Sequence, residues 1–169
     1  MLKVKLHLLD TGYCTNFEKM IAKNNPMRVK RFYALVGLIE HPTLGPILFD
    51  TGYSSHVIQL CKHFPYFLYS LITPIHFTNT QSAAYQIQKF GYKPEDVKHI
   101  ILSHFHPDHI GGLKDFNQAQ IHCSKYAYSK LKKLSFFGAL KEVFFKRLLP
   151  NDFAQRAHDI QNRSINVSF

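Results

Sequence analysis

Cysteine is scarce in this chain of 169 residues, and its three cysteines, Cys14, Cys61 and Cys123, lie far apart. Small secreted domains depend on a dense set of disulfides, so this odd and widely spaced trio excludes a disulfide framework and is typical of a reducing compartment. The N-terminus carries Lys3 and Lys5 but lacks the apolar stretch of a secretory signal peptide. The sequence therefore predicts a cytoplasmic protein.

Long hydrophobic runs are also absent. Residues 60–77 are dense in aromatic side chains, but Lys62, His63, Pro65 and Pro74 interrupt them, and a transmembrane helix needs about 20 consecutive apolar residues. We therefore expect no transmembrane segment. Three interpretations stay open for this stretch: a mobile surface segment that buries its rings against the core, an apolar wall or lid over a functional site, and peripheral contact with a membrane.

Acidic residues are few, with 11 Asp and Glu against 21 Lys and Arg, which gives a formal net charge of +10. Residues 124–169 hold nine of these cations and three acids, so +6 of the charge lies there. Charges spaced along helices most often form a solvated face. Because no nucleic-acid motif or basic groove with interleaved aromatics is visible, we do not expect a nucleic-acid partner.

Internal repeats and low-complexity linkers are missing as well, so we expect a single domain over residues 1–169, with room for a sizeable core. Apolar periodicity predicts a mixed α/β organisation, and strict alternation in residues 2–8 predicts a strand with one buried face and His7 on its solvated side. His41 and His122 are expected to be structural. The predicted elements are strands at 2–8, 32–40, 46–50, 98–103 and 118–123, and helices at 79–90, after Ser124 and at 136–149.

The most informative part of the chain is a cluster of potential metal ligands at His104, His106, Asp108 and His109. Imidazole and carboxylate groups suit zinc and similar divalent ions, which need three or four such ligands at roughly 2.0–2.2 Å. A helix or a strand would spread these four side chains over more than one face, whereas a loop at the end of a strand can aim them at one region. An apolar run just upstream and a glycine pair just downstream supply that context. The sequence therefore predicts a metal site on such a loop.

The pattern His-x-His-x-Asp-His followed by Gly-Gly resembles the metallo-β-lactamase superfamily of metal-dependent hydrolases. Phe49-Asp50-Thr51-Gly52 is similar to the Asp-Thr-Gly turn of that family, and residues 91–97 resemble the lead-in of its N-acyl-homoserine lactonase branch. The resemblance covers residues 1–125. It implies an α/β fold, the αββα sandwich of the family, and only its N-terminal half, because the later motifs with the remaining metal ligands have no match here.

The resemblance also implies roles for individual residues. His104 and His106 would hold one metal ion, and Asp108 and His109 a second, with zinc as the expected metal. A hydroxide shared by the two ions would attack the substrate, and Asp108 would orient it and pass a proton to the leaving group. Asp50 has two compatible interpretations: a strand-end carboxylate that caps its own turn, or a group beneath the metal loop that hydrogen-bonds to a ligand.

The expected function is a metal-dependent hydrolase that cleaves a small ester or lactone, most like an acyl-homoserine lactone. The alternatives are a thioester hydrolase of the glyoxalase type, a phosphodiesterase, and a truncated chain that binds metal weakly or not at all. Half of a sandwich would leave the core face of its sheet exposed, so we also expect self-association through that face.

Overall fold

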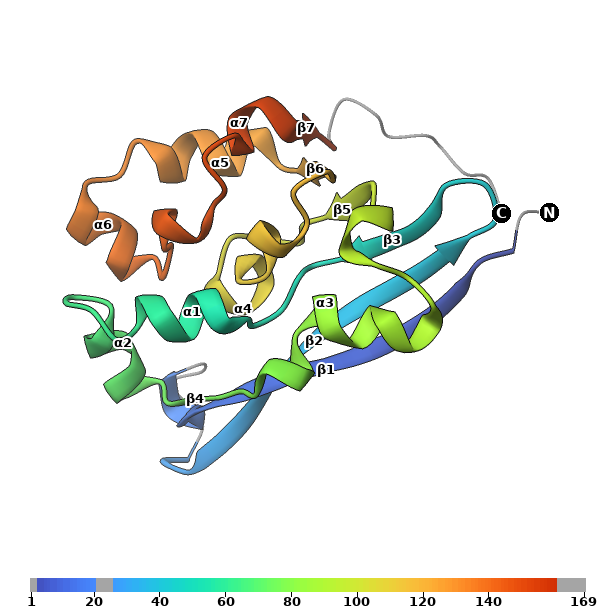
Figure 1. Ribbon diagram of the computed structural model, residues 1–169. Helices are drawn as coiled ribbons and strands as arrows, with labels where there is room; N and C mark the ends of the chain where they lie inside the picture. Colours follow the sequence, from blue (N-terminus) through green and yellow to red (C-terminus); the bar gives the residue numbers. More distant parts are fainter. Residues whose placement is uncertain (1–2, 21–25, 161–169) are drawn as a thin grey trace.

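The computed structural model describes residues 3–20 and 26–160 (Figure 1). Its centre is a seven-stranded sheet with the strand order β4-β1-β2-β3-β5-β6-β7. The first four strands of this order pair antiparallel, and β5, β6 and β7 continue from β3 in parallel. The strands are β1 (Lys5–Phe17), β2 (Val29–His41), β3 (Gly45–Phe49), β4 (Ile75–His76), β5 (His99–Ile101), β6 (Gln120–Cys123) and β7 (Ala157–Asp159).

The helices are short, and those around the sheet alternate with turns of 3-10 helix. The α-helices are α1 (Ser55–Leu60), α2 (Phe67–Ile72), α3 (Ala83–Gln86), α4 (Pro107–Ile110), α5 (Lys125–Lys132), α6 (Phe136–Lys141) and α7 (Phe153–Arg156). The 3-10 segments are η1 (Glu18–Met20), η2 (Asn79–Gln81), η3 (Ile87–Phe90), η4 (Pro94–Asp96), η5 (Leu113–Asp115) and η6 (Lys146–Leu148). Within residues 3–20 and 26–160, none of the helices has the length and apolarity needed to cross a bilayer.

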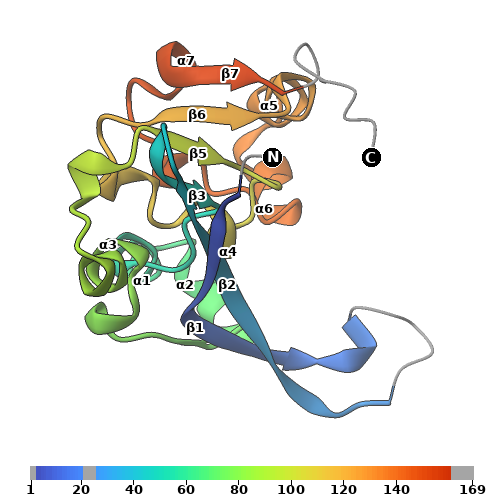
Figure 2. The same ribbon diagram turned by 90° about the vertical axis from the view of Figure 1, so that its right-hand side faces the viewer.

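The two faces of the sheet differ sharply in burial. One face, which we call the covered face, carries fully buried side chains on neighbouring strands, namely Val36, Leu38, Leu48, Ile100 and Ile121. The other, the open face, carries exposed large apolar side chains, namely Leu6, Leu8, Leu35 and Phe49. Figure 2 shows α1 and α3 together on one side of the β1–β2 hairpin. The mixed α/β fold with a single, half-covered sheet confirms the predicted fold class.

The predicted strand at residues 2–8 is confirmed in type, but the prediction of which face is buried is wrong. Its apolar side, with Leu6 and Leu8, lies on the open face. His7, expected to be solvated, lies on the opposite side, where its ring packs against Phe90 and its Nε2 lies 2.6 Å from a carboxylate oxygen of Glu40. Alternation identifies two sides of a strand, but the covering helices decide which side is buried. Residue 2 lies outside the described residues.

The predicted helices at 79–90 and 136–149 are each interrupted. The first divides into η2, α3 and η3, because the Ser82 hydroxyl accepts a hydrogen bond from Tyr85 N and caps a new helical turn. The second ends at Lys141, and Val143 adopts a positive φ of 51°, which an α-helix does not allow. The prediction that Ser124 caps the next helix is confirmed, since its Oγ accepts a hydrogen bond from Ala127 N.

Residues 60–77 form the end of α1, the whole of α2 and β4. Tyr66 and Tyr69 pack edge-on against the buried Phe145, with ring centroids 5.0 Å away in each case. The other side of α2 is exposed, as shown by Leu71 at 68%. The segment thus buries some of its rings, as the first interpretation holds, and leaves other apolar side chains in solvent.

Candidate metal centre

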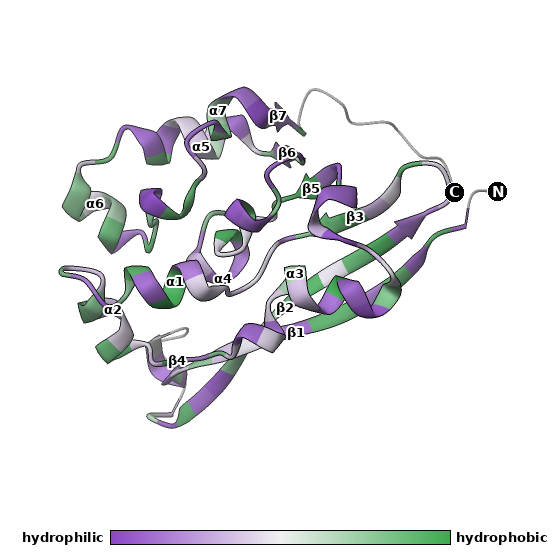
Figure 3. Cartoon of the chain, viewed as in Figure 1, coloured by the Kyte–Doolittle hydropathy of each residue, from purple (hydrophilic) through white to green (hydrophobic). Residues whose placement is uncertain are grey.

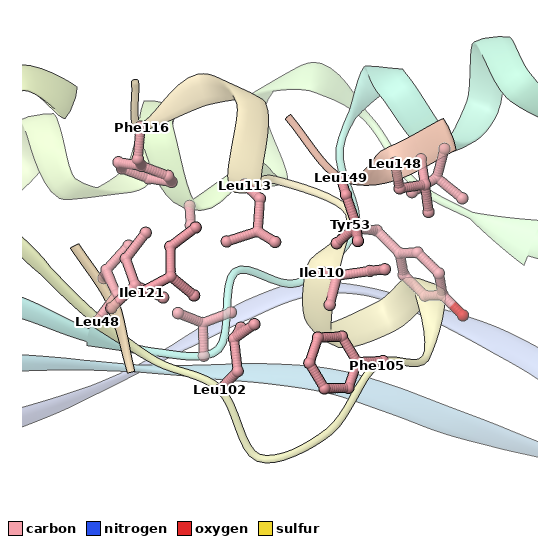
Figure 4. Packing of buried hydrophobic residues seen from close by; sticks show 14 of the residues in the cluster. Leu48, Tyr53, Leu102, Phe105, Ile110, Leu113, Phe116, Ile121, Leu148 and Leu149 are labelled. Carbon is pink, nitrogen blue, oxygen red and sulfur yellow. The ribbon is translucent and has the colours of Figure 1, made fainter. Parts of the chain in front are cut away.

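The four candidate ligands follow β5 on a segment anchored by alternating apolar side chains. Phe105 and Ile110 are buried in the core beneath the segment, together with Leu102 (Figure 4). Because Phe105 points inward, the histidines on either side of it are exposed. Sequence analysis predicted a loop for all four ligands, whereas Asp108 and His109 lie on α4, whose first residue is proline. Proline suits that position because its fixed φ is helical and its missing N–H would be unpaired there.

The glycine pair allows α4 to pack directly on the turn that follows β3. A Cβ atom added to Gly111 would lie 2.6 Å from the carbonyl oxygen of Gly52, and one added to Gly112 would lie 2.7 Å from that of Thr51. Both distances are shorter than any normal carbon–oxygen contact. The two glycines are therefore required by this close approach of backbone to backbone.

Hydrogen bonds join the same two segments. Thr51 donates from both its backbone N and its Oγ1 to the carbonyl oxygen of His109, at 2.8 Å each, and its Oγ1 accepts from Gly112 N at 3.1 Å. Ser54 Oγ donates to the carbonyl oxygen of Gly111 at 2.6 Å. The backbone of the ligand segment is thus held by the residues after β3 and not only by its own neighbours in the chain.

Asp50 lies beneath the ligands. It is 2% exposed and adopts a left-handed φ of 62°, which asparagine and aspartate tolerate better than other non-glycine residues. Its carboxylate accepts hydrogen bonds from Ser103 N at 2.8 Å and Ser103 Oγ at 2.7 Å, and lies 2.7 Å from His109 Nδ1. The carboxylate therefore reaches the ligand segment, and a proton on His109 Nδ1 would leave Nε2 available to a metal ion.

Ser103 is a residue of this site to which sequence analysis assigned no role. Besides its two bonds to Asp50, its Oγ lies 3.0 Å from His104 Nδ1 and 3.2 Å from His109 Nδ1. A hydroxyl immediately before the first histidine was the available signal. Its value became apparent only when the fold placed Asp50 below it.

The candidate ligands lie close to one another. The ring of His104 is 4.6 Å from that of His106 and 3.9 Å from that of His109, and His109 Nε2 lies 3.2 Å from Asp108 Oδ2. Nevertheless, no group of three or more His, Cys, Asp or Glu side chains within the described residues has the geometry to hold one ion. The side chains are gathered, but as pairs and not as a closed coordination shell.

Charge in the cluster is strongly coupled. Burial lowers the pKa of His104, and the neighbouring His109 and His106 lower it further, so its ring is neutral. For His109, burial acts in the same direction, but hydrogen bonds to Asp108 and Asp50 outweigh it and raise the pKa to about 9. Burial opposes ionisation of Asp108, yet its hydrogen bond with His109 and the charge of that ring lower its pKa overall. A proton and a metal ion would thus compete for the imidazole of His109.

The charge of Asp108 acts on two tyrosines, the buried Tyr53 and the half-buried Tyr69. Burial is the main cause that raises the pKa values of Tyr53 and Tyr69, and the charge of Asp108 adds to it. Both phenols therefore remain neutral. Tyr69 belongs to α2, within the aromatic segment of residues 60–77.

The remaining histidines named in the sequence analysis lie elsewhere. His122 Nε2 is 3.1 Å from His99 Nδ1 across β5 and β6, and the ring of His158 on β7 is 5.7 Å from that of His122. His41 Nδ1 accepts from the backbone N of Leu44 within its turn. None of these contacts involves the candidate ligands.

Comparison with protein families decides the assignment, because residues 29–160 match the model described as the metallo-beta-lactamase superfamily. The chain belongs to the metallo-beta-lactamase superfamily. Among curated proteins, an N-acyl homoserine lactonase from Bacillus cereus is 35% identical over 153 residues, which cover 87% of this chain and 56% of that protein. A probable metallo-hydrolase of Mycobacterium tuberculosis is 40% identical over 79 residues, which cover 46% of this chain and 24% of that protein.

Solved structures share the fold of this chain. An N-acyl homoserine lactone hydrolase with the product N-hexanoyl-L-homoserine bound at its catalytic metal centre matches with a TM-score of 0.75 at 22% identity, over 95% of this chain and 60% of that one. A probable metal-dependent hydrolase from Staphylococcus aureus matches with a TM-score of 0.70 at 12% identity, over 95% of this chain and 60% of that one. The chain thus spans about 60% of these structures and 24–56% of the curated relatives.

Proposed function

We propose that this chain carries part of the active site of a metal-dependent hydrolase that cleaves a small ester or lactone. The observation that carries the proposal is the carboxylate of Asp50, buried beneath the cluster and 2.7 Å from His109 Nδ1. Such a carboxylate fixes the tautomer and the orientation of a metal-ligating imidazole. Membership of the superfamily and 35% identity to a lactonase over most of the chain support the same function.

The donor set fits zinc in chemistry and is incomplete in number. Neutral imidazoles and a carboxylate are good zinc ligands, and we propose that His104 and His106 hold one ion and that Asp108 and His109 hold a second. Each pair supplies two ligands, whereas a four-coordinate zinc site takes three or four of its ligands from protein groups. The other groups would have to come from outside the described residues. A chain that binds metal weakly is therefore the second candidate, favoured by the unclosed geometry of the cluster.

When bound, the metal would lower the pKa of a coordinated water and so supply a nucleophile at neutral pH. Asp108, whose pKa is lowered and which is therefore ionised at neutral pH, would orient that water and carry a proton to the leaving group. When a lactone ring opens, its ring oxygen leaves as an alkoxide, which is a poor leaving group, so this proton is important. Asp50 and Ser103 would position the imidazole of His109 throughout.

A lactone with an apolar tail is the substrate we favour over thioesters and phosphodiesters. The charge of Asp108 contributes to the raised pKa of Tyr69 in α2, and we propose that the aromatic segment of residues 60–77 supplies an apolar wall beside the scissile bond. The solved hydrolase with N-hexanoyl-L-homoserine at its metal centre carries such a tail in its product. The free thiols of Cys14, Cys61 and Cys123 accord with a cytoplasmic location, which we also propose.

The test is a zinc titration followed by a hydrolysis assay. Tight zinc binding by the wild-type protein that is lost in His106→Ala, with turnover of N-hexanoyl-homoserine lactone, would support the lactonase. A glyoxalase-type thioester and a phosphodiester are assayed in parallel, and preferential turnover of either would reassign the substrate. Weak binding that His106→Ala does not change would leave the second candidate. Gln118→Ala, an exposed substitution on the approach to β6, is the matched control and should leave zinc binding unaffected.

We further propose that the chain self-associates through the open face of its sheet. Leu6, Leu8, Leu35 and Phe49 expose apolar surface there, and contiguous exposure of this kind usually marks a contact surface. The double variant Leu6→Gln/Leu8→Gln should shift sedimentation toward the monomer. A wild-type protein that is already monomeric at high concentration would refute the proposal.

A further inference from the structure

A second exposed apolar surface lies at the end of the molecule formed by α2 and α6, away from the open face. Tyr66, next to α2, packs edge-on against Phe136 of α6 with ring centroids 6.0 Å apart, so the two helices are neighbours. Figures 1 and 3 show both helices at the same end, and Figure 3 shows their hydrophobic colouring. We call this the α2–α6 surface. Its exposed apolar side chains are Phe64, Phe67, Leu68, Leu71, Ile72, Leu134, Phe136 and Phe137.

Most of these side chains do not attach the helices to the core. Neither α2 nor α6 contains a fully buried residue. Next to and within α2, Tyr66 and Tyr69 pack on Phe145, and in α6 the half-buried Ala139 and Leu140 pack against the core. Leu71 and Phe137, at 68% and 75% exposed, instead extend into solvent. A chain that keeps such groups in water bears a cost unless a partner covers them.

The surface is also strongly basic. Residues 60–72 and 130–149 hold seven Lys or Arg and one acid, Glu142, a net charge of +6 (7 − 1). All seven cations are exposed, and they are Lys62, Lys130, Lys132, Lys133, Lys141, Lys146 and Arg147. A groove of about 830 Å³ beside these helices, lined mainly by α1, the turn before α2 and η6, has Phe64, Phe136, Lys146 and Arg147 in its walls. Apolar and cationic groups thus lie together in the walls of this groove.

We propose that the α2–α6 surface docks on an anionic lipid bilayer. Leucine, isoleucine and phenylalanine side chains enter the boundary between headgroups and acyl chains, while lysines and arginines beside them bind acidic headgroups. Charge argues against a second copy of the chain on this surface, because two such surfaces would bring 14 cations together (7 + 7). Aliphatic side chains such as Leu71 and Ile72 argue against nucleic acid, whose bases stack on aromatic rings.

The proposal is independent of metal and of hydrolysis, so it is tested by binding alone. Flotation with vesicles of equal parts phosphatidylcholine and phosphatidylglycerol should recover the protein with the lipid, and vesicles of phosphatidylcholine alone should not. Raising the salt from about 0.1 M to about 0.5 M should weaken binding strongly, because screening shortens the range of the charges. Equal recovery with neutral vesicles, or no recovery with either, would overturn the proposal.

Two double variants separate the contribution of the cations to vesicle binding from that of the apolar side chains. Lys132→Gln/Lys133→Gln should lower the partition coefficient by about 30-fold, since each basic residue contributes about 1 kcal/mol at an anionic surface. Leu71→Ser/Phe137→Ser should lower it by about fivefold or more, because two large apolar side chains no longer enter the boundary between headgroups and acyl chains. All four residues are exposed, so the unfolding midpoint should not fall.

The matched control is Lys3→Gln/Lys5→Gln, which removes the same charge from exposed positions near the start of β1, at the opposite end of the molecule in Figure 1. This pair should leave vesicle binding nearly unchanged. An equal loss in the control would show that net charge alone drives binding and would contradict the proposal. A change of oligomeric state in Leu71→Ser/Phe137→Ser without vesicle binding by the wild type would assign the surface to a second copy instead.

Discussion

Leu8 and Leu9 are neighbours on β1, yet Leu8 is 68% exposed on the open face and Leu9 is 3% exposed on the covered face. Both faces of the sheet are apolar over several strands. The covered face is filled by side chains that this chain itself supplies from its helices and from the ligand segment. The open face has no such cover among the described residues. Composition alone therefore does not distinguish a core from an exposed apolar contact surface.

The candidate metal centre lies on the covered side of the sheet. There, the backbone positions of the ligand segment are fixed by Thr51, Ser54 and two glycines, and one imidazole is oriented by Asp50. The support beneath the candidate ligands is in place, whereas the part of the chain that the structure describes does not form a closed coordination shell above them. Local support and a closed shell are therefore separate requirements.

The largest effect on the free energy of unfolding should come from substitution of Leu9, compared with its neighbour Leu8. Leu9→Ala should lower the free energy of unfolding by about 2–5 kcal/mol, because it leaves a cavity in the core. At protein concentrations low enough to keep the chain monomeric, Leu8→Ala should change it by no more than about 0.5 kcal/mol, because the side chain is then exposed. Urea unfolding followed by circular dichroism measures both. Similar losses in the two variants would mean that another molecule covers the open face in solution.

The next effect concerns the contact between α4 and the turn after β3. Gly112→Ala should cost about 1–3 kcal/mol of unfolding free energy, because the new methyl group meets a backbone carbonyl that cannot move aside easily. Gly138→Ala in α6 is the matched control, since its added Cβ meets only side-chain atoms, of which the nearest is the Ser135 hydroxyl at 3.2 Å. The control should be neutral or stabilising in thermal unfolding. A neutral Gly112→Ala would show that the contact is looser than the structure indicates.

A smaller effect on folding but a clear one on binding is expected at Asp50. Asp50→Asn keeps a residue that tolerates the left-handed backbone and removes the negative charge beside His109, so zinc affinity should fall about 10–100-fold. Competition with a chromophoric chelator measures this change. Asp115→Asn removes another half-buried carboxylate, one that binds His56 and not the ligand segment, and should leave zinc affinity unchanged. Equal losses would argue against a specific role for Asp50.

The smallest effect should be on the pH dependence of the metal-free protein. The folded pKa of His109 is about 9, above its ordinary value of 6.5. Its ion pairs therefore contribute stability fully below pH 6.5, and this contribution is lost as the pH rises through about 9. The difference in Tm between the wild type and His109→Gln should shrink from pH 6 to pH 10. Zinc uptake at pH 7 should release a proton, which calorimetry in two buffers detects.

Sequence analysis predicted the parts of the molecule that depend on local chemistry. The strand before the ligands, the glycine pair and the cap at Ser124 follow from side-chain type and spacing, and the structure contains all three. The gathering of the four candidate ligands also follows from spacing. Their roles as ligands stay a prediction.

The features that sequence analysis did not predict depend on contacts between distant segments. The buried side of β1 is decided by helices that come later in the chain, and His7 lies on that side because Phe90 and Glu40 meet it there. The helix predicted at 136–149 ends early because Val143 takes a left-handed conformation, after which Phe144 and Phe145 enter the core. Ser103 acquired a role only through Asp50, which lies 53 residues earlier.

The contact of Gly111 and Gly112 with the turn after β3 has a consequence for protein engineering. Residues 50–54 and 103–112 behave as one discontinuous building block, because hydrogen bonds and backbone packing join them across the intervening chain. A histidine-rich peptide copied from 103–112 alone would lack residues 50–54, which support this segment in the protein. Transfer of this block to another scaffold needs two parallel neighbouring strands, as β3 and β5 are here, so that both segments start from the same edge of a sheet.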